Sequence, residues 1–129
     1  MTFSPDHIDH VELYARDVDA AVRWYGQVLG LKLIHDLPPP NPKMIGLGGT
    51  MLAIFKAKRD GPDNADDDSQ PPIRWRRVAW GTNKEGFAQA QKHLSSKGVD
   101  FTGPIDHDIS RSIYFNDPDG NPLEITYYV

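Results

Sequence analysis

The residues best suited to chemistry lie near the C-terminus, where one carboxylate interrupts an apolar strand. Residues 113–115 are β-branched or aromatic, residues 123–128 are again strand-like, and the two stretches flank the turn sequence Asp117-Pro-Asp-Gly120. This pattern predicts a β-hairpin. Glu124 lies in the second strand between two apolar residues. Because successive strand side chains point to opposite faces, Glu124 is expected on the face opposite those neighbours, where it can bind a cation or accept a proton.

Two stretches of the chain share one predicted order of elements: strand, helix, strand, strand, strand. The first helix covers residues 17–30, with Asp17 as N-cap and Gly30 as a left-handed C-terminal residue. The second covers residues 82–98, where Thr82-Asn-Lys-Glu85 fits a capping box. The remaining predicted strands are residues 10–15, 31–35, 43–48, 50–56, 75–81 and 99–102. The sequence therefore predicts an internal repeat.

The repeat assigns the whole chain, residues 1–129, to one α+β domain built from two modules. Module 1 is expected at about residues 7–58 and module 2 at about residues 73–129. The segment 59–72 is acidic and contains proline, a composition typical of a mobile connector.

Composition excludes several classes of protein. The net charge of −4 gives no basic surface for nucleic acid. The sequence has no apolar run long enough for a membrane span and no signal-peptide pattern, so a cytoplasmic protein is expected. There is no cysteine, which excludes disulfides, thiolate catalysis and zinc–thiolate sites. Any metal would have to be held by histidine and carboxylate.

The repeat also predicts which positions are equivalent in the two modules. Laying Val11 on Val78 superposes His10 on Arg77. Laying Gly49 on Gly120 superposes Ala53 on Glu124. If the modules are related by a pseudo-two-fold axis, the four superposed positions line one cavity.

These residues resemble a known family. A repeated βαβββ module, a strand histidine at the start and Asp117-Pro-Asp-Gly-x-x-x-Glu124 at the end resemble the vicinal oxygen chelate superfamily, which includes glyoxalases, bleomycin-resistance proteins and extradiol dioxygenases. The resemblance implies an eight-stranded incomplete barrel, a homodimer and a divalent metal (Fe, Mn, Zn or Ni). By position it makes His10 and Glu124 the metal ligands. The family's usual third ligand, a histidine, falls on Arg77, which has no lone pair for coordination.

A second fragment resembles the C-terminal signature of extradiol dioxygenases. It consists of Ile105-Asp-His107, Ile113-Tyr114 and the turn that ends at Glu124. The resemblance implies that His107 is a proton-transferring residue and that Tyr114 is a hydrogen-bond donor to substrate. Candidate substrate-binding residues are Ser112, which shares a strand face with Tyr114, together with Arg77 and Trp80.

Two functions remain open at this point. One is a metal-dependent lyase, transferase or extradiol-dioxygenase-type enzyme that acts on a small oxygenated substrate, with water, Glu12 or His107 completing the metal shell. The other is a metal-free protein that binds a small molecule or antibiotic, like the bleomycin-resistance proteins, with Arg77 and Glu124 as polar anchors. A fold alone does not decide between them.

Overall fold

A computed structural model describes residues 7–58 and 75–129. The chain divides into two compact units, Met1–Arg59 (unit 1) and Asp60–Val129 (unit 2), and each is described by itself. The predicted connector, residues 59–72, lies outside the described residues.

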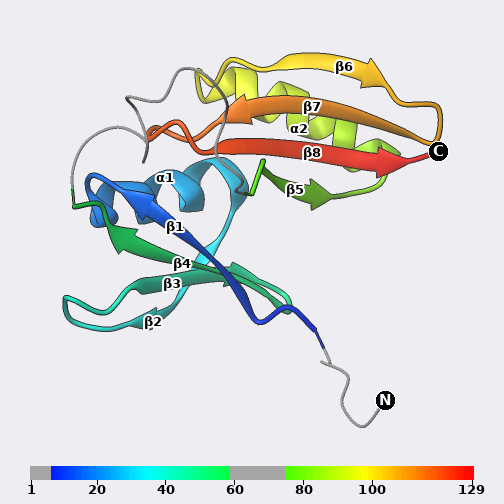
Figure 1. The fold of residues 1–129 in the computed structure, drawn as a ribbon. Coiled ribbons are helices and arrows are strands. Elements are labelled where there is room, and N and C mark those ends of the chain that lie inside the picture. The colour runs from blue at the N-terminus through cyan, green and yellow to red at the C-terminus, as the bar shows by residue number, and fades with distance from the viewer. Residues whose placement is uncertain (1–6, 59–74) are drawn as a thin grey trace, which may run out of the picture. The chain divides into compact units, whose positions relative to one another are not determined.

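Unit 1 has one helix and one four-stranded mixed sheet (Figure 1). Strand β1 is one of the two edge strands and runs parallel to β4, while β4, β3 and β2 pair antiparallel in that order. The elements are β1 (His10–Ala15), α1 (Val18–Leu29), β2 (Lys32–Asp36), β3 (Lys43–Leu47) and β4 (Thr50–Lys56).

The ends of α1 agree with the sequence prediction. The Asp17 carboxylate accepts a hydrogen bond from the Ala20 amide at 3.0 Å, and Gly30 adopts the left-handed conformation with φ = 73°. Tyr25 on the helix is fully buried, as are Ile45 and Leu52 on the sheet. Each such side chain contributes about 1.5–3 kcal/mol through burial.

Unit 2 repeats this topology with β5 as one edge strand, parallel to β8, and with β8, β7 and β6 pairing antiparallel. The elements are β5 (Val78–Gly81), α2 (Lys84–Ser96), β6 (Thr102–Asp106), β7 (Ser110–Asn116) and β8 (Pro122–Tyr128). Helix α2 packs on β8 through Phe87 and Tyr127, whose ring centroids are 4.9 Å apart. Tyr127 alternates with Glu124 along β8, so the helix covers the face that Glu124 does not occupy.

In unit 2 the starts of α2, β5 and β6 differ from the sequence prediction. Asn83, not Thr82, caps α2, because its side-chain oxygen accepts from the Gly86 amide at 2.8 Å. Strand β5 begins at Val78, so Trp75 precedes it and is 89% exposed. Strand β6 begins only at Thr102, because Val99 still belongs to the helix end, where its amide donates to the Leu94 carbonyl.

The turn between β7 and β8 sets the register of the C-terminal hairpin. Asp117 is buried, and its Oδ1 accepts from the amides of Asp119 at 2.9 Å and Asn121 at 2.8 Å. Gly120 supplies the positive φ, 84°, that the turn requires. With the turn fixed, Tyr114 lies directly opposite Glu124.

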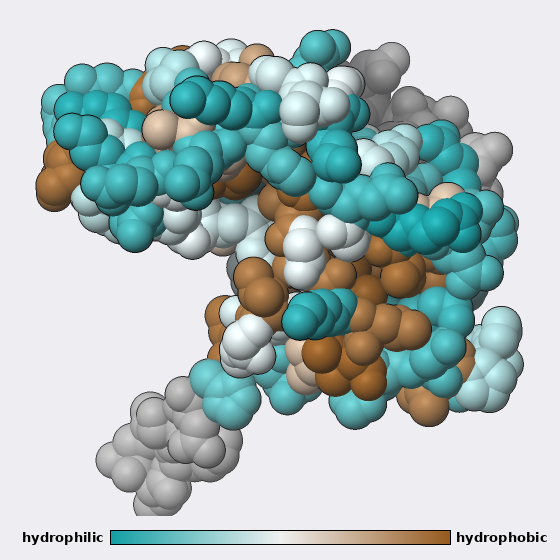
Figure 2. Space-filling model, turned by 180° about the vertical axis from the view of Figure 1, so that it is seen from behind, coloured by the Kyte–Doolittle hydropathy of each residue, from teal (hydrophilic) through white to brown (hydrophobic). Residues whose placement is uncertain are grey.

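The α+β class and the two βαβββ modules are confirmed. No helix in the described part of the chain is long and apolar enough to cross a membrane. Several large apolar side chains of unit 1 are exposed, including Leu33, Ile34 and Leu47, and Figure 2 shows apolar atoms at the protein surface.

Candidate functional site

Three of the chemistry-bearing side chains of unit 2 lie on one transverse row of its sheet. Strand pairing places Glu124 on β8 between Ala79 on β5 and Tyr114 on β7, and it places Thr102 on β6 beyond Tyr114. Residues directly opposite each other in neighbouring strands share a face. The row therefore presents a carboxyl group, a phenol and a hydroxyl on the face away from α2.

Glu124 is held by a buried hydroxyl. Ser112 is fully buried, and its Oγ donates a hydrogen bond of 2.7 Å to Glu124 Oε2. The Oγ of Ser112 also lies 3.0 Å from Thr126 Oγ1, which in turn lies 3.1 Å from the Arg111 carbonyl oxygen. These contacts orient the carboxyl group. Ser112 thus supports Glu124 from within the sheet. It does not line the cavity, although its sequence position had suggested that it would.

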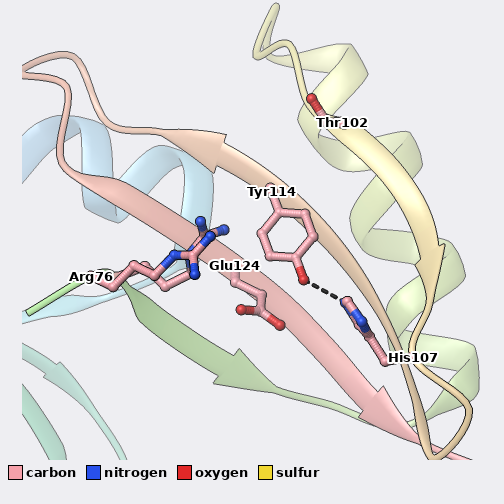
Figure 3. A pocket seen from close by; sticks show the side chains of 6 residues that line it. Arg76, Thr102, His107, Tyr114 and Glu124 are labelled. Carbon is pink, nitrogen blue, oxygen red and sulfur yellow. Dashed lines mark hydrogen bonds between the residues drawn. The ribbon is translucent and has the colours of Figure 1, made fainter.

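Tyr114 and His107 form a hydrogen-bonded pair. His107 Nε2 lies 2.6 Å from the Tyr114 hydroxyl oxygen, with the two rings nearly perpendicular (Figure 3). Which atom carries the shared proton depends on the imidazole tautomer. The structure therefore brings into direct contact the two residues to which the family resemblance gives a role in proton transfer.

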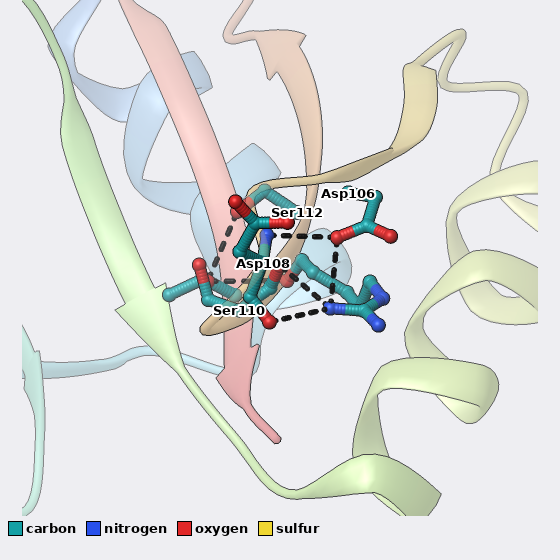
Figure 4. A network of polar contacts seen from close by, with 6 residues as sticks. Asp106, Asp108, Ser110 and Ser112 are labelled. Carbon is teal, nitrogen blue, oxygen red and sulfur yellow. Dashed lines mark hydrogen bonds and ion pairs between the residues drawn. The ribbon is translucent and has the colours of Figure 1, made fainter.

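The loop between β6 and β7 holds His107 in place. Its amide donates to the Ser110 carbonyl at 2.9 Å, and the Ile109 amide donates back to the His107 carbonyl at 2.8 Å. The Asp106 carboxylate accepts from the Asp108 amide at 2.8 Å and pairs with Arg111 at 3.1 Å (Figure 4). This network stabilises the tight turn, in which Asp108 has φ = 68°.

These side chains line a cavity of about 660 Å³ in unit 2 (the unit 2 cavity). Figure 3 shows Arg76, Glu124, Tyr114 and His107 pointing into the same space. The guanidinium carbon of Arg77 lies 4.5 Å from the centroid of the Tyr114 ring, a cation–π contact. The lining residues are Arg76, Arg77, Thr102, His107, Tyr114 and Glu124.

His10, the other predicted metal ligand, belongs to unit 1 and has both ring nitrogens engaged. Nδ1 lies 2.8 Å from an Asp9 carboxylate oxygen, and Nε2 lies 3.1 Å from one of Glu12. The hydrogen bond to Asp9, followed by that to Glu12, raises the pKa of His10 above its usual value. An imidazole that is protonated, or bonded at both nitrogens, has no free lone pair for a metal.

The residues described here do not fit the family's metal set. Within residues 7–58 and 75–129, no three histidine, aspartate or glutamate side chains are placed to hold one ion. In the unit 2 cavity the carboxylate and histidine side chains that could bind a metal are Glu124 and His107, and His107 is hydrogen-bonded to Tyr114. The family resemblance puts the third ligand at Arg77, whose guanidinium cannot coordinate a metal.

The structure separates one candidate from the cavity and adds two. Trp80 lies opposite Ile125, on the apolar face of the sheet, and its indole nitrogen is buried. Arg76 and Thr102 line the cavity although the sequence did not single them out. The only sequence hint for Thr102 was its place at the end of the predicted strand 99–102.

Comparisons with known proteins agree with this architecture. Residues 7–125 match the model of the Glyoxalase/Bleomycin resistance protein/Dioxygenase superfamily. The chain is 30% identical to virulence protein STM3117 of Salmonella typhimurium, over 96% of this chain and 85% of that protein. It is 26% identical to biphenyl-2,3-diol 1,2-dioxygenase 3 of Rhodococcus globerulus, over 97% of this chain but only 64% of the dioxygenase.

A solved structure shows the same fold. The glyoxalase/dioxygenase from Nostoc punctiforme superposes with a TM-score of 0.79 at 22% identity, covering 100% of this chain and 97% of that one. The protein is a member of the glyoxalase/bleomycin-resistance/dioxygenase superfamily, the vicinal oxygen chelate fold.

Proposed function

We propose that the protein is an enzyme that moves a proton on a small oxygenated substrate bound in the unit 2 cavity. The observation that carries this proposal is the 2.6 Å contact between His107 and Tyr114 on the cavity wall. A histidine has the right basicity for proton transfer near neutrality, and a hydrogen-bonded phenol can relay that proton to a substrate oxygen.

The geometry suggests a division of work among the lining residues. Tyr114 gives its hydroxyl proton to an oxygen of the substrate as His107 Nε2 gives a proton to the Tyr114 oxygen, and in the reverse step Tyr114 takes its proton back and returns one to His107. Glu124, fixed by Ser112, presents a second proton acceptor from the neighbouring strand. Two such groups in one cavity allow a proton to leave one atom of the substrate and return to another.

The test is deuterium exchange into a panel of small α-hydroxy ketones in D₂O, followed by proton NMR. The wild-type chain should accelerate loss of the signal of the hydrogen next to the carbonyl, and Tyr114→Phe should lower that rate at least about 100-fold. Tyr128→Phe is the matched control, because Tyr128 is 74% exposed at the end of β8. Equal rates in wild type and Tyr114→Phe would contradict the proposal.

The metal-dependent alternative is supported by Glu124 on the cavity wall. It makes His10 and Glu124 the ligands of a divalent ion in a lyase, transferase or dioxygenase. Elemental analysis of protein purified without chelator decides it. One metal ion per chain, lost in both His10→Ala and Glu124→Ala, would favour the alternative, and metal-free protein that still catalyses exchange would exclude it.

The binding-protein alternative is supported by Arg77, a permanent cation in the cavity. It predicts that ligands bind but that no exchange is catalysed on any member of the panel.

For the chain's association, we propose a homodimer, and exposed apolar residues of unit 1 such as Leu33 and Ile34 are consistent with it. Sedimentation equilibrium at two protein concentrations measures the mass directly.

A further inference from the structure

We propose that Arg76 and Arg77 form an oxyanion-binding subsite, so that the substrate carries a carboxylate, phosphate or phosphonate group. The inference rests on the proposed function in one respect, since both place the substrate in the unit 2 cavity. It adds the charge of that substrate and the residues that recognise it.

The charge of the cavity is opposite to that of the chain. The protein carries a formal net charge of −4, yet the cavity lining contains two guanidinium groups and a single carboxyl group. Guanidinium groups stay protonated at all relevant pH values. A cavity with this lining attracts anions, and the attraction is directed at the two arginines.

Neither arginine is neutralised within the described part of the chain. No ion pair there joins Arg76 or Arg77 to a carboxylate, and in particular none joins either to Glu124. The Glu124 carboxyl group is instead bonded to Ser112 at 2.7 Å. An internal Arg–Glu pair would have explained the arginines structurally, and these residues do not form one.

The contact that Arg77 makes leaves its hydrogen-bond donors available. Its guanidinium carbon lies over the Tyr114 ring at 4.5 Å, and a cation–π contact does not consume N–H groups. A guanidinium has five N–H donors in a planar fork that matches a carboxylate or phosphate in a bidentate manner. Arg77 is half-buried, so stacking on Tyr114 orients the fork, while Arg76 is exposed at the cavity and supplies a second charge.

Tyr114 would lie between the anionic group of the substrate and its reacting oxygen. One part of the residue, its ring, contacts Arg77, while its hydroxyl contacts His107. An anionic group held by Arg77 would therefore bind beside the phenol that reaches the reacting oxygen. The substrate class that follows is a small acid, carboxylic or phosphorus-based, with a second oxygen function a few bonds away.

The test measures binding, not turnover, by isothermal titration of the full-length protein at low salt with three probes of similar shape. Benzoate and phenylphosphonate carry the anion, and benzamide is neutral. Benzoate or phenylphosphonate should bind at least about 10-fold more tightly than benzamide. The affinity for the preferred anion should fall by a further factor of several as the salt concentration is raised, because charge attraction is screened. Which of the two anions binds more tightly distinguishes a carboxylate from a phosphorus acid.

Variants assign the effect to the arginines. Arg77→Gln should weaken binding of the preferred anion about 10- to 100-fold, and Arg76→Gln about 3- to 10-fold because that side chain is more exposed. Arg23→Gln removes the same charge from the exposed face of α1 and should change little. Arg77→Lys keeps the charge but loses the planar fork, so its affinity for the preferred anion should lie between those of the wild type and Arg77→Gln. The lysine variant also serves as the test if the glutamine variant folds poorly.

Equal affinity for benzoate, phenylphosphonate and benzamide would overturn the subsite, as would equal losses in Arg23→Gln and Arg77→Gln. The proposed function fails differently. Tyr114→Phe and His107→Gln would then leave deuterium exchange unchanged, whatever the anion affinity. An anion that binds through Arg77 in a protein that catalyses no exchange would support the subsite and contradict the enzyme.

Discussion

The two units have the same topology, but their equivalent residue rows carry different chemistry. Strand pairing gives a matching row of four positions across each sheet. In unit 1 the row is Glu12, Ala53, Met44 and His35, and in unit 2 it is Ala79, Glu124, Tyr114 and Thr102. Each row contains one carboxylate and one alanine side by side, with their strands exchanged.

The different strand position of the carboxylate in each unit changes what surrounds it. Glu12 lies on edge strand β1, its side chain is 61% exposed, and it pairs with His10, two residues away. Glu124 lies on inner strand β8 with a strand on each side, and a fully buried Ser112 donates to it. An inner position offers neighbours on both sides that can fix and desolvate a group, and an edge position does not. A carboxylate is thus oriented for chemistry in unit 2 and solvated in unit 1.

The largest expected effect compares the two histidines near these rows. His107→Gln should lower the rate of deuterium exchange about 100- to 10,000-fold, because it removes the proton acceptor bonded to Tyr114. His35→Gln alters the unit 1 row at an exposed position and should leave the rate within about two-fold. Proton NMR in D₂O measures both. A comparable loss in His35→Gln would show that the chemistry is not confined to unit 2.

A smaller effect is expected from the support beneath Glu124. Ser112→Ala removes the donor to Glu124 Oε2 at a position with 0% exposure, and it should lower the free energy of unfolding by about 1–3 kcal/mol. Ser96→Ala also removes a hydroxyl hydrogen bond, to the His93 carbonyl at 2.7 Å, but at an exposed site. Its cost should stay below about 0.5 kcal/mol.

Urea unfolding of both serine variants measures the difference. A double-mutant cycle with Glu124→Gln then separates the Ser112–Glu124 coupling from the general cost of an altered core. A coupling energy near zero would mean that Ser112 is only a packing residue and that Glu124 is not positioned by it.

The parts of this site that were predictable depend on short-range rules. Asp117-Pro-Asp-Gly120 fixes the turn, and the turn fixes which residue of β7 faces Glu124. The period of two along a strand then places Tyr114 and Glu124 on one face. The same period puts Trp80 on the face opposite Ala79 and Glu124, so the predicted cavity role of Trp80 conflicted with the rule that placed Glu124.

Thr102, one of the two residues that sequence reasoning missed, depends on irregular backbone. The register between β6 and β7 shifts between Thr102 and Ile105, where Gly103 has φ = 113°. A Cβ at Gly103 would lie 2.7 Å from the Ser112 carbonyl oxygen, so the close approach of the strands requires glycine. No pattern of polar and apolar residues reveals such a shift. The cavity position of Thr102 follows from it and could not have been read from the sequence.

The smallest expected effect concerns the acidic surroundings of His10 in unit 1. Hydrogen bonds to Asp9 and then Glu12 raise the pKa of His10 from 6.5. A group whose folded pKa is raised stabilises the folded state below its unfolded pKa, and that contribution is lost as pH rises through the folded value. Stability from this cluster should therefore be fully present below about pH 6 and decline above it.

An NMR pH titration of the His10 ring protons checks the direction, and two variants check the cause. Asp9→Asn should lower the pKa of His10 more than Glu12→Gln does, because the Asp9 hydrogen bond is the larger contribution. The side chain of His10 is 32% exposed, so neither variant should change stability by more than a few tenths of a kcal/mol. A pKa below 6.5 in the wild type would mean that the carboxylates do not hold the imidazolium. His10 would then have a nitrogen free for a metal, and the contrast between a solvated unit 1 row and a chemically equipped unit 2 row would have to be abandoned.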